Sequence, residues 1–305
     1  FISFMFLFLI LNYERKETNN LPRKKIGQNG RKRVCLFFKS MFEQIGTYLT
    51  TTPLYSVEMI SILVLVGAFV GFINTVAGMA TIISYALFMA MGMPINIANA
   101  TTRFGVLAQF SVTSAVFRKQ GYLDLRLATK VGIPVAIGAF LGAEFAALLP
   151  TNVIEWTTGC VIPLIAVLLF IDKKKITDRY ESLSHSNMSI WKYLVFFIIG
   201  IYGGFTHVGV GLLIMFGSFF LLGLDLLHAN AIKQFAVVIY TPIALVIFAL
   251  HGQINWPVAL IYALGNITGG YFASKVAIRW GERFIRVCVL IVVLAMSFWL
   301  IYKQF

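Results

Sequence analysis

The sequence predicts an all-α polytopic membrane protein made of two inverted repeats of about five helical segments each. Of its 305 residues, 59% are hydrophobic and only 12% are charged, whereas a soluble domain has about 25% charged residues. The few charges are unevenly placed, and Arg103 is the only charged residue between Ser61 and Phe117. Long apolar segments separated by short charged loops are typical of a chain whose solvent is the lipid bilayer.

Ten apolar segments follow one another along the chain. Six have about 19 residues or more, enough to cross about 30 Å of hydrocarbon at about 1.5 Å per residue. The other four are too short to span comfortably and contain 14 or 15 residues. The short segments are 57–71, 79–92, 190–203 and 210–223, and the long ones are 98–117, 125–148, 153–171, 229–250, 257–277 and 284–302.

The short segments fall in matching places because the chain contains an internal repeat. "GFINTVAG" at 71–78 matches "GFTHVGVG" at 204–211, which places His207 opposite Asn74. After a two-residue adjustment, "GMPINIANATTR" aligns with "GLDLLHANAIKQ", and the 131-residue offset continues as far as Gly138 and Gly269. The predicted domains are a first transmembrane repeat, a cytoplasmic linker and a second transmembrane repeat, at 41–171, 172–189 and 190–305.

The charges of the loops predict that the two repeats are inverted. The loops 118–130, 172–192 and 275–286 are rich in Lys and Arg, whereas 149–155 and 251–256 contain neither. By the positive-inside rule the first three are cytoplasmic and the last two are external. The repeat-related loops 118–130 and 251–256 therefore lie on opposite sides, as expected for a multi-pass protein of the cell (plasma or inner) membrane.

Residues 1–40 do not fit this scheme, because they contain nine Lys and Arg residues against two Glu. A segment placed just before the first crossing should be external and poor in Lys and Arg. We expect a basic N-terminal arm that is either disordered or translated upstream sequence. The alternative is an ordinary basic cytosolic tail followed by one additional crossing.

The Gly-rich breaks between the short segments predict the substrate site. In lipid, a broken helix is tolerated only where it is buried in protein or lines a wet cavity. Inverted repeats with Gly-interrupted segments in corresponding positions indicate the binding site of a transporter. The helix N-termini that follow such breaks favour anions. Helix packing through small residues is the alternative for each single glycine.

Polar side chains repeat on one helical face in the two halves. Asn99, Thr102 and Arg103 are spaced i, i+3, i+4, and the matching trio in the second half contains Lys233. We expect both cations to supply positive charge along one anion path; snorkelling of their side chains is the alternative. His207 either joins this path or is a satisfied core histidine. The predicted substrate-binding residues are Asn74, Thr75, Gly78, Asn99, Thr102, Arg103, His207, Gly209, Gly211, Asn230, Lys233 and Gln234.

The motifs "GFINTVAG…GMPINIANATTR", "GIYGGFTHVGVGLL…GLDLLHANAIKQ" and "GNITGGYFASKVA" resemble the two halves of the TauE/SafE sulfite exporter family, over about residues 57–303. The resemblance implies outward movement of a small anion, such as sulfite, thiosulfate, sulfoacetate or a taurine-related compound. The first half departs from the family pattern, since Met79-Ala80-Thr81 replaces a run of Gly and Ser and no Pro occurs between Ala77 and Pro94. The identity of the anion therefore stays open.

Two other functions compete with anion transport. A divalent-metal permease would use His207, His228 and His251, and a membrane-embedded enzyme would need a nucleophile, an acid/base pair or a metal motif such as HExxH, which the sequence lacks. We expect no catalytic residue, no bound metal and no cofactor. The expected partners are a small anionic substrate and the lipid bilayer, with no nucleic acid. The sequence leaves assembly into a homo-oligomer open.

Overall fold

The computed structural model describes residues 44–150, 153 and 188–304, and every regular element in this part of the chain is a helix. This confirms the predicted all-α class. The predicted arm at 1–40 lies outside the described residues. So do almost all of the segment 153–171 and of the linker 172–189.

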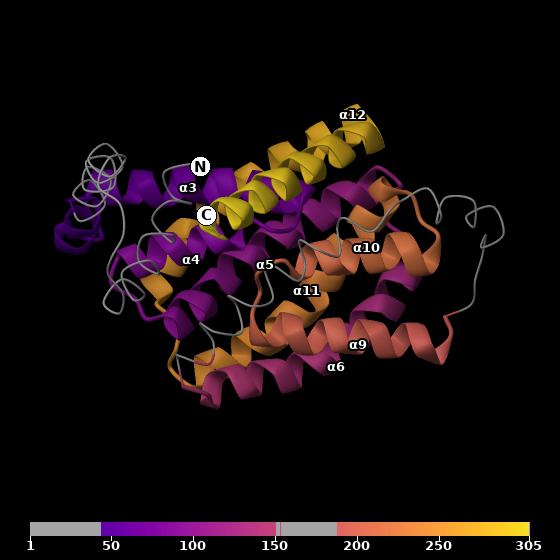
Figure 1. Ribbon diagram of the computed structural model, residues 1–305, viewed down its shortest axis with the longest axis horizontal. Helices are drawn as coiled ribbons and strands as arrows, with labels where there is room; N and C mark the ends of the chain where they lie inside the picture. The colour runs from indigo at the N-terminus through magenta and orange to yellow at the C-terminus, as the bar shows by residue number, and fades with distance from the viewer. Residues whose placement is uncertain (1–43, 151–152, 154–187, 305) are drawn as a thin grey trace, which may run out of the picture.

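Eight helices of at least ten residues are found in the described part of the chain, four from each predicted repeat (Figure 1). Their positions follow the predicted apolar segments, and Gly281, which has φ 67°, divides the last of them into two. The first repeat contributes α3 (Val57–Val76), α4 (Thr81–Ala90), α5 (Ile95–Lys119) and α6 (Leu125–Leu148). The second contributes α9 (Ile190–Phe205), α10 (Val210–Leu222), α11 (Leu226–Leu250) and α12 (Trp256–Gln304).

The predicted length of the first segment is wrong, because α3 does not end at Gly71 but continues to Val76 and has 20 residues. Gly71 serves close packing here and does not break the helix. A Cβ atom at this position would lie 2.5 Å from the backbone oxygen of Asn266 in α12. Among the described helices, α3, α6 and α11 are long and apolar enough to cross a membrane. The other three predicted short helices are indeed short, with 10 residues in α4, 16 in α9 and 13 in α10.

The two repeats pack on each other reciprocally. The first helix of each repeat lies along the fourth helix of the other, so that α3 packs on α12 and α9 packs on α6. In Figure 1 the α6 and α9 pair forms one side of the molecule, and α5 and α11 cross its centre. The contact reciprocal to that of Gly71 and Asn266 is made by Gly200 of α9, which sits against the backbone of Val135 in α6, the residue 131 positions before Asn266. This reciprocity fits a two-fold relation between the halves, and their inverted orientation in the membrane stays a prediction.

The first break, residues 77–80 between α3 and α4, lies against the start of α10, directly after the second break, residues 206–209 between α9 and α10. Gly78 and Gly209 precede α4 and α10 with φ values of 77° and 76°, which favour glycine. A Cβ atom at Gly78 would lie 2.7 Å from the backbone nitrogen of Leu212 in the first turn of α10. These two glycines are 131 residues apart, whereas the ends of α3 and α9, Val76 and Phe205, are 129 apart, so the ungapped match of 71–78 with 204–211 does not hold in the structure.

The predicted match of His207 with Asn74 is therefore wrong, because the two residues do not occupy corresponding places in the structure. Asn74 belongs to the last turn of α3, whereas His207 lies in the break between α9 and α10. The sequence match placed them together because the alignment of 71–78 with 204–211 contained no gap.

Candidate functional site

Lys233 lies on α11 and reaches the end of α3. Its Nζ donates to the backbone oxygen of Thr75 at 2.8 Å and to that of Asn74 at 3.2 Å. These carbonyls belong to the last turn of α3, which has no following turn to supply N–H partners. A cation at a helix C-terminus is stabilised by the partial negative charge of such carbonyls. The side chain is fully buried, and the ring of Phe110 lies 5.8 Å from the ammonium.

Arg103 on α5 has the same relation to the end of α9. One guanidinium nitrogen, Nη1, donates to the backbone oxygen of Gly203 at 3.1 Å, and Nη2 donates to that of Gly204 at 2.7 Å. Nη2 also donates to Asn99 Oδ1 at 3.2 Å, and the ring of Phe248 lies 4.8 Å from the guanidinium carbon. Each cation thus joins the third helix of one repeat to the end of the first helix of the other.

Amide and hydroxyl side chains surround the Lys233 contact. Gln234 Nε2 donates to the backbone oxygen of Thr75 at 2.9 Å and to Asn230 Oδ1 at 3.1 Å. Gln109 Nε2 donates to Thr75 Oγ1 at 2.8 Å, and Thr113 donates to Gln234 Oε1 at 2.9 Å. Gln109 and Thr113 are missing from the residues predicted from sequence. Their signal was the polar face of α5, which Asn99 and Thr102 begin and which these two continue at helical spacing.

A second network surrounds the break that contains His207. Asn99 donates to the backbone oxygen of Phe205 at 2.9 Å and accepts from Tyr85 at 2.6 Å. The backbone N–H of His207 donates to Tyr85 Oη at 3.4 Å, and its Nδ1 is hydrogen-bonded to Tyr240 at 2.7 Å. His207 is therefore a satisfied buried histidine, connected to Arg103 through Tyr85 and Asn99. Tyr85 and Tyr240 were not among the residues predicted from sequence, because a tyrosine in an apolar segment is typical of the protein core or of the membrane interface.

The remaining predicted residues divide between the two breaks and the helices. Asn74 donates to Thr81 Oγ1 at 3.3 Å across the first break. The Thr102 hydroxyl donates to the backbone oxygen of Asn99 at 2.8 Å. Among the described hydrogen bonds, none joins it to a side chain of either network. The residues brought together at the first break are Asn74, Thr75, Gly78, Gly211, Asn230, Lys233 and Gln234; those at the second break are Asn99, Arg103, His207 and Gly209.

The described interior is positively charged. Arg103 and Lys233 are both 0% exposed, and no Asp or Glu side chain is buried in the part of the chain that the structure describes. Among the described residues, the hydrogen-bond acceptors of these cations are backbone oxygens at the ends of α3 and α9 and the side-chain oxygen of Asn99, none of which carries a full negative charge.

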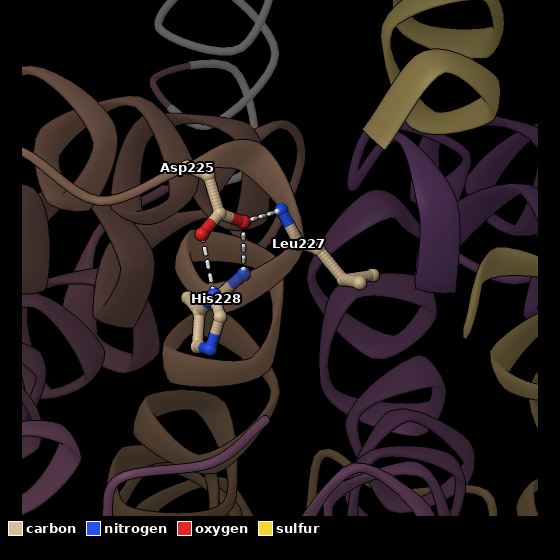
Figure 2. A network of polar contacts seen from close by, with 3 residues as sticks. All are labelled: Asp225, Leu227 and His228. Carbon is tan, nitrogen blue, oxygen red and sulfur yellow. Dashed lines mark hydrogen bonds and ion pairs between the residues drawn. The ribbon is translucent and has the colours of Figure 1, made fainter. Parts of the chain in front are cut away.

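Asp225 and His228 form a separate polar pair at the start of α11 (Figure 2). One carboxylate oxygen accepts from the backbone N–H groups of Leu227 and His228, at 2.8 and 3.0 Å, and the other contacts the His228 ring. Partial burial raises the pKa of Asp225, but the hydrogen bonds and charge of His228 outweigh this effect, so the net shift is downward. This pair caps the helix and is too exposed to belong to the buried site.

The sequence model of the sulfite exporter TauE/SafE family matches residues 63–300, which is more than three quarters of the chain. The chain belongs to this family. It is a membrane transporter of the TauE/SafE type, whose surroundings are a lipid bilayer and whose cargo is a small substrate.

Curated relatives of this TauE/SafE protein are described as probable membrane transporter proteins. One from Sinorhizobium, ORF9, is 26% identical over 76% of this chain and 88% of its own length. One from Haemophilus influenzae is also 26% identical, over 81% of this chain and 96% of its own length. YfcA of Escherichia coli is 22% identical over 81% of this chain and 91% of its own length. No solved structure matches the chain.

The geometry of this TauE/SafE transporter does not support one metal site made from His207, His228 and His251. His228 lies in the first turn of α11 and His251 follows its last residue. A 25-residue helix is about 37 Å long, so these two side chains cannot hold the same ion. The metal-permease alternative therefore loses the residues on which it depended.

Proposed function

We propose that this TauE/SafE transporter exports a small sulfur-containing oxyanion or organosulfonate, such as sulfite, thiosulfate or sulfoacetate, across the cell membrane. The observation that carries the proposal is the pair of buried cations, Arg103 and Lys233, without a buried carboxylate among the described residues. An isolated charge in a membrane interior is strongly unfavourable, and such residues usually mark a substrate or ion pathway.

The charge balance supports an anion as cargo. A helix C-terminus is equivalent to about half a negative charge. Two cations set against two such termini leave roughly one positive charge, which a bound anion would neutralise. The N-termini of α4 and α10, which lack side-chain caps, add backbone N–H groups beside the same breaks.

The membrane potential is sufficient to drive export. An inside-negative potential of 100 mV favours the exit of a monoanion by about 2.3 kcal/mol, without a coupling ion. Alternating exposure of the breaks would follow from rocking of the two inverted halves, as in other transporters with inverted repeats. In this arrangement residues 172–192 are cytoplasmic and residues 251–256 are external.

The test is sulfite efflux from proteoliposomes that contain the purified protein at a set voltage. Lys233→Gln and Arg103→Gln should each reduce the rate at least about tenfold, since each removes one of the two cations buried in the part of the chain that the structure describes. Lys275→Gln removes the same charge from an exposed position beside Tyr271 and should leave the rate unchanged. If both buried-site variants fold and carry sulfite at the unmutated rate, the proposed site is wrong.

A further inference from the structure

Asn99 and Asn230 stand 131 residues apart, at the offset that relates the two predicted repeats, but only one of them has partners for its whole side chain. Asn99 accepts from Arg103 and donates from Nδ2 to the backbone oxygen of Phe205, at the end of α9. Asn230 accepts from Gln234, but its Nδ2 is buried without a hydrogen-bond partner among the described residues. A buried donor without a partner is strongly destabilising, so this amide is available for a ligand.

The second break is filled by its own residues. Residues 206–208 precede its glycine, whereas only Ala77 precedes the glycine of the first break. One of these additional residues, His207, is hydrogen-bonded through its backbone to Tyr85 and through its ring to Tyr240. The longer chain and the two tyrosines therefore occupy the second break.

The first break does not have these tyrosines. At the 131-residue offset, the counterpart of Tyr85 is Phe216 of α10, which has no hydroxyl. The counterpart of Tyr240 is Gln109 of α5, whose Nε2 donates to atoms of α3. Fewer polar side chains thus bond within the first break than within the second, in the part of the chain that the structure describes.

Lys233 is a cation that the repeat does not require. At the same offset its counterpart is Thr102, and the counterpart of Arg103 is Gln234. Gln234 Nε2 donates to the end of α3 and to an asparagine one turn before it, as Arg103 Nη2 does at the end of α9. Gln234 therefore already makes the contact of Arg103, and Lys233 is additional to it.

Lys233 and Asn230 supply free donors from one turn of α11. The ammonium has three N–H groups, and two of them are used in its described bonds to carbonyls of α3. Gln234 connects the Asn230 amide to Thr75 O, which also accepts from Lys233. Among its nitrogens, Arg103 is left with Nε alone, because both terminal nitrogens donate to the end of α9.

The start of α10 lies beside the Lys233 side chain. A Cβ atom built on Gly211, in the first turn of this 13-residue helix, would lie 3.4 Å from Lys233 Cδ. The described side chains give this N-terminus no cap. Its first N–H groups therefore add positive partial charge on the same side.

We propose that the two breaks have different roles: the anion binds at the first break, to Lys233 Nζ and Asn230 Nδ2, whereas the second break, held by Arg103, is structural. Both free groups at the first break are donors, which suit the acceptor oxygens of a sulfur oxyanion. A cationic substrate would be repelled by Lys233 and would find no acceptor in the Asn230 amide nitrogen. This inference rests on the proposed anion transport and assigns its binding site to one of the two breaks.

Asn230→Leu in the full chain tests this assignment, with sulfite as the probe and two measurements. One is the KM for sulfite transport in proteoliposomes, and the other is the rise in melting temperature that added sulfite causes in detergent. The KM should increase at least about tenfold, the effect of one hydrogen bond to a charged group, and the rise should shrink. Without sulfite the melting temperature should be unchanged or higher, because Gln234 keeps its bond to Thr75 and an unpartnered donor is removed.

Two further variants separate binding from structure. Asn230→Asp keeps the shape of the side chain but replaces the donor by an acceptor, so it should weaken sulfite binding more than leucine does. Asn99→Leu should instead lower the melting temperature without sulfite, because Tyr85 and Arg103 lose an acceptor, and it should keep the rise caused by sulfite. Ser218→Ala is the control, because its buried hydroxyl also has no partner among the described residues but lies in α10, outside both breaks. It should change neither measurement.

The assignment is overturned if the variants of Asn230 bind sulfite normally. A wild-type KM and a wild-type rise in melting temperature, in whichever of Asn230→Leu, Asn230→Ala and Asn230→Asp folds, would have this meaning and would leave anion transport intact. Loss of the rise in Asn99→Leu together with its retention in Asn230→Leu would place the anion at the other break. Absence of transport of sulfite, thiosulfate and sulfoacetate by the wild-type protein would instead refute the proposed function.

Discussion

Substituting Gly78 by alanine tests whether the contact between the two breaks stabilises the fold. Gly78 has φ 77°, a conformation in which a non-glycine residue costs about 1–2 kcal/mol. The added Cβ atom would also lie 2.7 Å from Leu212 N and 2.9 Å from the carbonyl carbon of Gly211. Both neighbours are backbone atoms that cannot rotate away, and overpacking of this kind costs typically about 1–3 kcal/mol. We expect a total destabilisation of about 2–5 kcal/mol.

Gly121→Ala is the matched control for this prediction. Gly121 has φ 81°, and no heavy atom lies within 4 Å of a Cβ atom built there. It should therefore show the backbone strain alone, about 1–2 kcal/mol. The assay is thermal unfolding of both variants in detergent at one scan rate, because unfolding of such proteins is commonly irreversible. Equal melting temperatures for the two variants would refute the contact between the breaks.

Three further predictions concern the cap of α11, the topology and Arg103. Asp225→Asn should lower stability by roughly 0.3–1 kcal/mol at neutral pH, because asparagine caps a helix as well as aspartate does but lacks the negative charge that is favourable at a helix N-terminus. Because the fold lowers the pKa of Asp225, its stabilisation is present above the ordinary value of 3.8 and is lost as the pH falls through the lowered value, so unfolding curves of the two proteins should converge only in strong acid. Cysteines introduced at Ser184 and Gln253 should be labelled from opposite sides of the membrane, and labelling of both from one side contradicts the inverted arrangement. Arg103→Lys should slow sulfite efflux and lower the melting temperature, since one ammonium cannot replace the two guanidinium nitrogens that donate to the backbone oxygens of Gly203 and Gly204. A wild-type efflux rate together with a wild-type melting temperature would contradict this prediction.

The sequence predicts the helices of this protein well, because a helix that spans lipid requires a long apolar segment with charged residues at its ends. It fails at the end of α3. A glycine in an apolar segment can end a helix or admit a neighbouring backbone, and the sequence around Gly71 is the same in both cases. Only the position of Asn266, almost 200 residues later, decides between them.

The site was predictable in part for a similar reason. Arg103 and Lys233 stand out because charges are rare in apolar segments, and both lie at the breaks. Their partners are backbone carbonyls, which every residue has, so no residue type marks them.

The two buried cations also constrain how the protein is made. Arg103 belongs to the half that is synthesised first, yet the carbonyls it holds are those of Gly203 and Gly204 in the second half. The carbonyls at the end of α3 likewise have no hydrogen bond from Lys233 until the second half has been synthesised. When ribosomal synthesis has completed only the first half, that half contains a cation and a helix end that lack their partners within the membrane. The first half is thus expected to remain a substrate for chaperones and membrane proteases until α11 is inserted, and a truncated chain that ends before α11 should be degraded.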